Sequence, residues 1–125
     1  MSTSDQSAGR VAVDPKALED LRKFGGDAML QKLIMLYREQ VEVRVMALRG
    51  ALATGDMGAA RQAAHALKSS SGQIGAVGLQ ELCKRTEHAA IDNDRDEVAA
   101  CFAEFDGVVT AVDRWLTDRG FPPEP

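Results

Sequence analysis

The chain has 125 residues, of which 45% are hydrophobic, 27% are charged and 5% are aromatic. This length suffices for one domain whose hydrophobic core needs no disulfide or metal. Its 15 basic and 19 acidic residues give a net charge of −4, which argues against nucleic acid or an anionic membrane as partner, because both attract positive charge.

Residues 1–11 are polar and rich in serine, and we expect them to form a disordered tail. They contain no positive segment followed by an apolar run, so no signal peptide is predicted. No apolar stretch approaches the roughly 18 residues that span a bilayer. Cys83 and Cys101 belong to no CxxC motif and have no histidine at ligand spacing, which favours two buried free thiols. The sequence therefore predicts a cytoplasmic protein without a metal site.

Two helical segments are predicted in the first half of the chain. Asp14 and Pro15 are an N-cap and a first helical residue, and the short helix that they open ends at Gly25–Gly26. A long helix begins at Asp27 and runs to about residue 54, with apolar residues spaced by threes and fours.

Three more helices follow, at Met57 to about Ile74, at Val77 to about Ile91, and after the turn at 92–94. The apolar residues of the last helix recur in steps of four and three without a break. They are Val98, Phe102, Phe105, Val109, Val112 and Leu116. Four long amphipathic helices joined by short turns predict an all-α fold, an antiparallel four-helix bundle with a short extra N-terminal helix. The bundle is expected over residues 12–119, with residues 120–125 as a C-terminal tail.

The segment HALKSSSGQIGA, which begins at His65, is unusual for a helix interior. On a helical wheel, one buried side is formed by Ala60, Ala63, Leu67 and Ile74, and His65 lies opposite. Small or polar residues surround His65 on the outer face. They are Gly58, Arg61, Gln62, Lys68, Ser69 and Gly72.

This outer face gives up helix stability, because each glycine costs roughly 1 kcal/mol relative to alanine. We interpret Ser69 and Gly72 as residues that keep the surface beside His65 low for an approaching partner. Ser70 and Ser71 turn toward neighbouring helices, where they serve packing and can bond back to the carbonyl four residues earlier.

An exposed imidazole beside a cation suits the transfer of an anionic group. Imidazole is a nucleophile near neutral pH because its ordinary pKa is about 6.5. Lys68 can offset the charge of a phosphoryl group, and Arg61, one turn before His65, can add to this. The chain has no Gly-rich nucleotide loop and no metal-binding carboxylate pair. His65 would therefore receive its phosphoryl group from another protein.

The stretch AHALKSSSGQIGAVGLQELC resembles the signature of histidine-containing phosphotransfer (HPt) domains, with its HxLK followed by a small residue and GA. The resemblance implies a four-helix bundle that accepts a phosphoryl group on one histidine and passes it to or from a receiver-domain aspartate. It makes His65 the acceptor, through Nε2, Lys68 the charge-stabilising lysine, and Ser69 the small residue, often glycine, at which the partner approaches.

The same resemblance implies partners and one supporting residue. The expected partners are a response-regulator receiver domain, which brings Mg²⁺, and a histidine kinase; this chain needs no cofactor and is expected to be a monomer. Family members often carry Gln or Glu 22 residues after the histidine, where this chain has Glu87. A carboxylate that accepts the Nδ1 proton would fix the tautomer and leave Nε2 free.

Two alternatives stay open. The chain could be an HPt-like adaptor that binds a receiver or a kinase without taking phosphate, although an intact His65 favours the relay. A helical-bundle enzyme or metal protein is disfavoured, because no convergent carboxylates or Glu-x-x-His pairs are present. His88 lacks the surroundings of His65 and is interpreted as an ordinary solvated or partly packed side chain.

Overall fold

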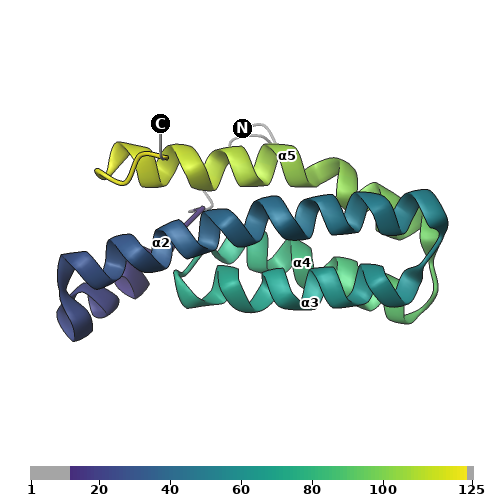
Figure 1. Ribbon diagram of the computed structural model, residues 1–125, viewed down its shortest axis with the longest axis horizontal. Coiled ribbons are helices and arrows are strands. Elements are labelled where there is room, and N and C mark those ends of the chain that lie inside the picture. The colour runs from purple at the N-terminus through teal and green to yellow at the C-terminus, as the bar shows by residue number, and fades with distance from the viewer. Residues whose placement is uncertain (1–11, 124–125) are drawn as a thin grey trace, which may run out of the picture.

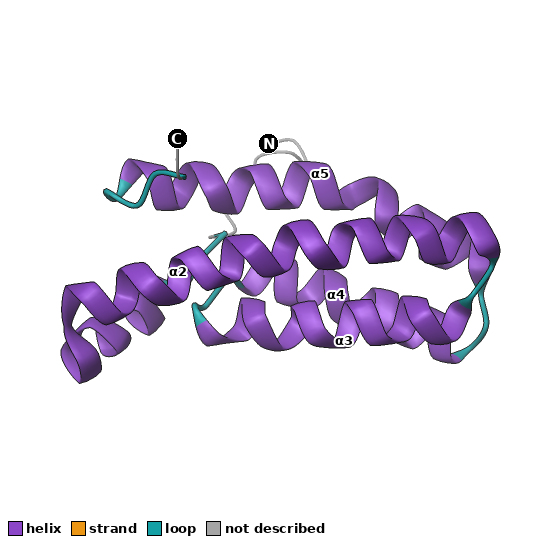
Figure 2. Cartoon of the chain, in the orientation of Figure 1, coloured by secondary structure: helices purple, strands orange, loops and turns teal. Residues whose placement is uncertain are grey.

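Four helices make up the described part of the computed structural model, residues 12–123, and this range contains no strand. The helices are α2 (Pro15–Thr54), α3 (Met57–Gln73), α4 (Val77–Ile91) and α5 (Arg95–Asp118). Short turns join them and neighbouring helices lie alongside one another, so they form a four-helix bundle (Figures 1 and 2). The predicted fold class is confirmed. The predicted tail over residues 1–11 lies outside the described residues.

The predicted short N-terminal helix is the first part of α2. Asp14 caps it, because its carboxylate accepts a hydrogen bond from the Lys16 amide at 3.0 Å. At Gly26 the backbone leaves helical geometry, with φ 83° and ψ 176°, a conformation that glycine adopts most readily. The first turns, purple in Figure 1, therefore fold back beneath the start of the long segment. A sharp bend at Gly26 thus separates the two segments that the sequence predicted.

The core consists of the apolar stripes that the sequence predicted, together with small residues on α3. Burying such side chains supplies most of the stability of a domain of this size. All four helices contribute, and the turn after α3 adds Ile74. The largest side chains with less than 2% exposure include Leu30, Ile34, Leu48, Leu67, Ile74, Leu79, Val98, Val112 and Leu116.

The bundle extends past the predicted boundary at residue 119. Phe121 is buried, and its amide donates a hydrogen bond to the Leu116 carbonyl at 3.0 Å. Its carbonyl accepts a hydrogen bond from the Arg38 guanidinium at 2.6 Å, and that guanidinium also donates to Asp113 at 2.7 Å. The predicted tail over residues 120–125 therefore starts too early, because the gain from burying an aromatic ring keeps the chain on the bundle before the prolines.

Val13 and Asp14, just before α2, pack on the turn that ends α3. Val13 is fully buried, and the Asp14 amide donates a hydrogen bond to the Gly75 carbonyl at 2.7 Å. Gly75 has a φ of +73°, and a Cβ there would lie 2.6 Å from the Cβ of Ala17. This close contact fixes the position of the end of α3, the helix that carries His65.

We expect Gly75→Ala to lower the free energy of unfolding more than Gly55→Ala does. The two glycines have nearly equal φ, +73° and +74°, so each variant carries the cost of a left-handed alanine, about 1 kcal/mol. Gly75→Ala also forces a methyl group onto Ala17, and such overpacking typically costs about 1–3 kcal/mol. At Gly55 the nearest atom to a new Cβ belongs to the Arg95 side chain, at 3.4 Å. Urea unfolding followed by circular dichroism measures both losses, and equal losses would contradict the close contact at Gly75.

Candidate functional site

The α3 helix displays His65 on a solvent-facing side. The predicted buried side is confirmed, since Ala60, Ala63, Leu67 and Ile74 are all exposed by 3% or less. The His65 side chain, on the opposite side, is 59% exposed. A packed helix therefore holds an imidazole at the surface, where another molecule can reach it.

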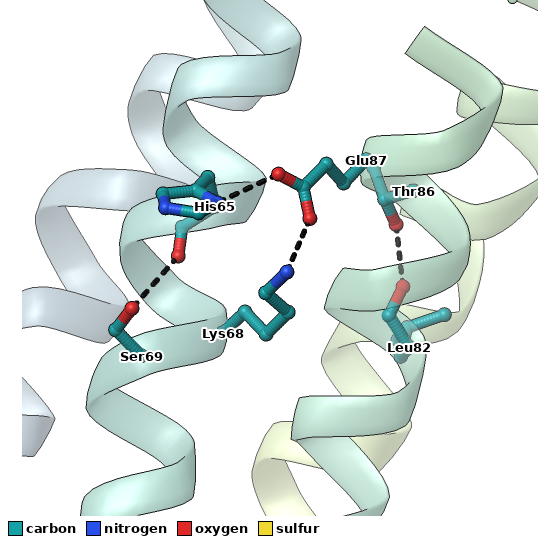
Figure 3. A network of polar contacts seen from close by, with 6 residues as sticks. All are labelled: His65, Lys68, Ser69, Leu82, Thr86 and Glu87. Atoms are coloured by element: carbon teal, nitrogen blue, oxygen red, sulfur yellow. Dashed lines mark hydrogen bonds and ion pairs between the residues drawn. The ribbon is translucent and has the colours of Figure 1, made fainter. Parts of the chain in front are cut away.

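Glu87 of α4 points toward both His65 and Lys68 of α3 (Figure 3). Its Oε2 is 2.7 Å from His65 Nδ1, and its Oε1 is 2.6 Å from Lys68 Nζ. The Glu87 side chain is only 8% exposed. One buried carboxylate thus holds two side chains of the neighbouring helix, one with each oxygen.

The contact with Glu87 determines which nitrogen of a neutral His65 ring is free. An ionised carboxylate only accepts hydrogen bonds, so Nδ1 carries the proton and donates it. Figure 3 shows the second ring nitrogen on the side away from Glu87, and no hydrogen bond from residues 12–123 reaches it. Nε2 therefore presents its lone pair to solvent, which is the arrangement that the sequence predicted for these two residues. The effect of Glu87 on phosphoryl transfer stays a prediction.

Glu87 is ionised at neutral pH although it is buried. The hydrogen bond from the Lys68 ammonium lowers the pKa of the carboxyl, and the contact with His65 lowers it further. Burial raises the pKa of Glu87, but by less than the hydrogen bond from Lys68 lowers it. The two contacts therefore offset the cost of placing a charge out of water.

Lys68 contacts the carboxylate rather than the open side of the imidazole. Its side chain is 29% exposed and its ammonium is bonded to Glu87. The sequence predicted that Lys68 would act on a phosphoryl group directly, and it gave no sign of the Lys68–Glu87 pair. The two residues are 19 positions apart on different helices, and nothing in their spacing marks the contact.

The three serines after Lys68 differ in their surroundings. Ser71 is fully buried and donates to the Leu67 carbonyl at 2.7 Å, and the partly buried Ser70 donates to the Ala66 carbonyl at 3.3 Å. Ser69 is exposed, and its hydroxyl donates to the His65 carbonyl at 3.4 Å. The predicted division is therefore correct, since of the three only Ser69 lies on the exposed face with His65.

The position of Gly72 differs from the prediction. A Cβ at this position would lie 2.6 Å from Nε2 of Gln80, so a side chain of α4 covers the space that the prediction left open. A wheel drawn for one helix cannot show what its neighbour covers, and Gly72 is a packing position between α3 and α4. Arg61 is exposed on α3, and its side chain forms no ion pair or hydrogen bond with residues 12–123.

The remaining reactive side chains offer no second centre in the described residues. Cys83 and Cys101 are free and buried, and burial raises the pKa of the Cys83 thiol to about 12, which keeps it protonated. Between residues 12 and 123, His, Cys, Asp and Glu side chains form no group of three that could hold a metal ion. No helix in this range is long and apolar enough to cross a membrane.

Comparison with known proteins bears on this site. The family model of the Hpt domain matches residues 32–116, which contain all of α3 and α4. The crystal structure of histidine-containing phosphotransfer protein B (HptB) from Pseudomonas aeruginosa PAO1 matches with a TM-score of 0.82 at 25% sequence identity. That match covers 86% of this chain and 93% of the other. A search of curated proteins gave no significant match.

We expect Lys68→Met to raise the pKa of Glu87, because burial remains while the partner that lowers the pKa most is removed. Carboxyl ¹³C NMR across a pH titration measures this shift. Lys84→Met, which removes an exposed lysine of α4, should leave the titration unchanged.

The same variant should change how stability depends on pH. In the wild type the lowered pKa of Glu87 contributes stability above the ordinary value of 4.5, and this contribution is lost as the pH falls through the folded-state pKa. Lys68→Met should therefore lose less stability than the wild type between pH 6 and pH 3. An equal loss in both proteins, measured by urea unfolding, would contradict the ion pair.

Proposed function

The chain belongs to the family of histidine phosphotransfer (Hpt) domains, and on this basis we propose that His65 is the residue that carries the phosphoryl group. Membership of the family and the match to HptB make the protein a phosphotransfer carrier of two-component signalling. The observation that carries the proposal is the exposed Nε2 of His65, on a ring held from its other nitrogen by the buried Glu87.

Transfer from a receiver domain uses the lone pair of Nε2. Nε2 attacks the phosphorus of an aspartyl phosphate in line; the P–N bond forms as the P–O bond breaks, and the electron pair returns to the aspartate carboxylate. The reverse transfer follows the same path. Catalysis of this kind depends on positioning and on charge stabilisation around the phosphoryl oxygens. The receiver would supply Mg²⁺ for that stabilisation, so the chain acts as a carrier without turnover of its own.

The surface around His65 suits a partner with an acidic active site. Ser69 adds little bulk beside the imidazole, and the exposed Arg61 provides positive charge one turn away. Receiver active sites are rich in carboxylates, so this charge would favour encounter with them. We propose a receiver domain and a histidine kinase as the two partners, and a monomer as the working form.

A cytoplasmic location is proposed on chemical grounds. Both cysteines are free thiols, and free thiols persist in reducing compartments. The partners proposed above would have to be present in the same compartment.

His65→Gln should abolish labelling when the protein is incubated with a phosphorylated receiver domain, because the amide has no nucleophilic nitrogen. His88→Gln, which changes the exposed histidine of α4, should be labelled as the wild type is. The phosphoprotein should be labile in acid and stable in base. Labelling that survives in His65→Gln would refute the proposal, and wild-type protein that binds the receiver but takes no phosphate would favour the adaptor.

Ser69→Gln should slow transfer from the receiver several-fold by placing a larger side chain where the partner approaches. The same variant should react with phosphoramidate, a small donor, at close to the wild-type rate. The ratio of the two rates separates access of the partner from reactivity of the imidazole. Equal slowing with both donors would contradict the assigned role of Ser69.

A further inference from the structure

We propose that the negative charge of Glu87 keeps Nδ1 of the phosphorylated His65 ring protonated, and thereby sets how readily the phosphoryl group leaves. This inference deepens the proposed function and rests on it, since it requires that His65 carries the phosphoryl group on Nε2. It assigns Glu87 a role after phosphorylation, beyond orienting the ring before it.

The geometry places the negative charge of Glu87 next to Nδ1 of the His65 ring. Once Nε2 is bonded to phosphorus, Nδ1 is the ring nitrogen left to hold a proton, and the protonated ring is a cation. The Glu87 carboxylate, 2.7 Å from Nδ1 and 8% exposed, would stabilise that cation. Water screens this interaction little on the Glu87 side, because the carboxylate is buried.

The bond changes show why this proton matters. When a nucleophile attacks the phosphorus of phosphorylated His65, the P–Nε2 bond breaks and its electron pair stays on Nε2. If Nδ1 carries a proton, the leaving group is neutral imidazole; without that proton it would be the much poorer imidazolate anion. In the reverse step, neutral His65 attacks and Nδ1 keeps the same proton. The proton thus remains between Nδ1 and Glu87 in both directions, and none has to be moved during transfer.

Lys68 acts in this arrangement through Glu87. Its ammonium, 2.6 Å from Oε1, keeps the carboxylate ionised, while Oε2 remains for Nδ1. The charged groups that face the ring are therefore Glu87 from α4 and Lys68 from α3, the helix that carries His65. Within residues 12–123, no titratable side chain of α2, the other helix packed against α3, bonds to His65 or Glu87. Lys68 is a positioning residue for the carboxylate.

Glu87→Gln separates the charge from the hydrogen bond. The amide has nearly the same shape, and with its single oxygen toward His65 it still accepts the Nδ1 proton, while its NH2 group takes the position of the oxygen that faced Lys68. It brings no charge. If Glu87 served only to orient the ring, the phosphorylated variant would lose its phosphoryl group as fast as the wild type does. If the charge matters, the variant's phosphohistidine should be longer-lived at alkaline pH.

The test follows the decay of phosphohistidine in the full chain from pH 6 to pH 9 after labelling with phosphoramidate. In that labelling step Nε2 attacks phosphorus and ammonia leaves. At pH 8 we expect Glu87→Gln to decay slower than the wild type by on the order of tenfold, the effect of one adjacent opposite charge on a titrating group. Glu81→Gln removes an exposed carboxylate of the same helix and should decay as the wild type does. After unfolding in urea, all three half-lives should coincide.

A second measurement needs no variant and covers the case in which Glu87→Gln labels poorly. The ¹⁵N spectrum of the phosphorylated wild type reports directly whether Nδ1 carries a proton, and we expect it to do so at pH 8. An unprotonated Nδ1 at that pH, or equal half-lives for wild type and Glu87→Gln, would overturn the inference while leaving His65 as the carrier. Labelling that persists in His65→Gln would instead overturn the proposed function.

Discussion

A single buried carboxylate organises the site. Glu87 is ionised in surroundings that disfavour charge, and the Lys68 ammonium and the His65 ring are the groups that compensate for this. A buried charge that loses its partner is strongly destabilising, so the packing of α4 on α3 has to keep all three groups together. The relative position of these two helices therefore decides both the orientation of the imidazole and the accessibility of Nε2.

The rest of the bundle serves to hold α3 and α4 in that position. Alanines on α3, among them Ala60 and Ala63, are buried and add little bulk, which allows close packing of neighbouring helices. Gln80 of α4 lies over Gly72, a contact that a side chain at residue 72 would obstruct. At the end of α3, the tight turn at Gly75 packs against Ala17 of the N-terminal segment. A carrier whose chemistry depends on positioning benefits from such a rigid frame, because little of the approach energy is spent on ordering the nucleophile.

The sequence alone predicts the structural features that depend on one helix at a time. Periodicity predicts the four long helices and the buried side of α3, and hence the exposure of His65, and the glycines at 25 and 26 predict the break before the long helix. Features that depend on contacts between elements were harder to predict. The Glu87–His65 contact came from family resemblance, whereas the Lys68–Glu87 pair and the covering of Gly72 by Gln80 had no signal in residue spacing. The two prolines after Phe121 predict a tail there, because local sequence cannot show that α2 and α5 leave room for its ring.

The proposed chemistry is divided between this chain and its partners. A carrier that must both take and give a phosphoryl group cannot bind it too strongly, because stabilisation of the loaded state slows the next transfer. In the proposed mechanism Glu87 stabilises the protonated ring from the side opposite Nε2, but the same proton lets the ring leave as neutral imidazole, and Lys68 keeps Glu87 ionised. In this mechanism the phosphoryl oxygens would be left to the Mg²⁺ and cations of a receiver partner, and the chain would act on the leaving group.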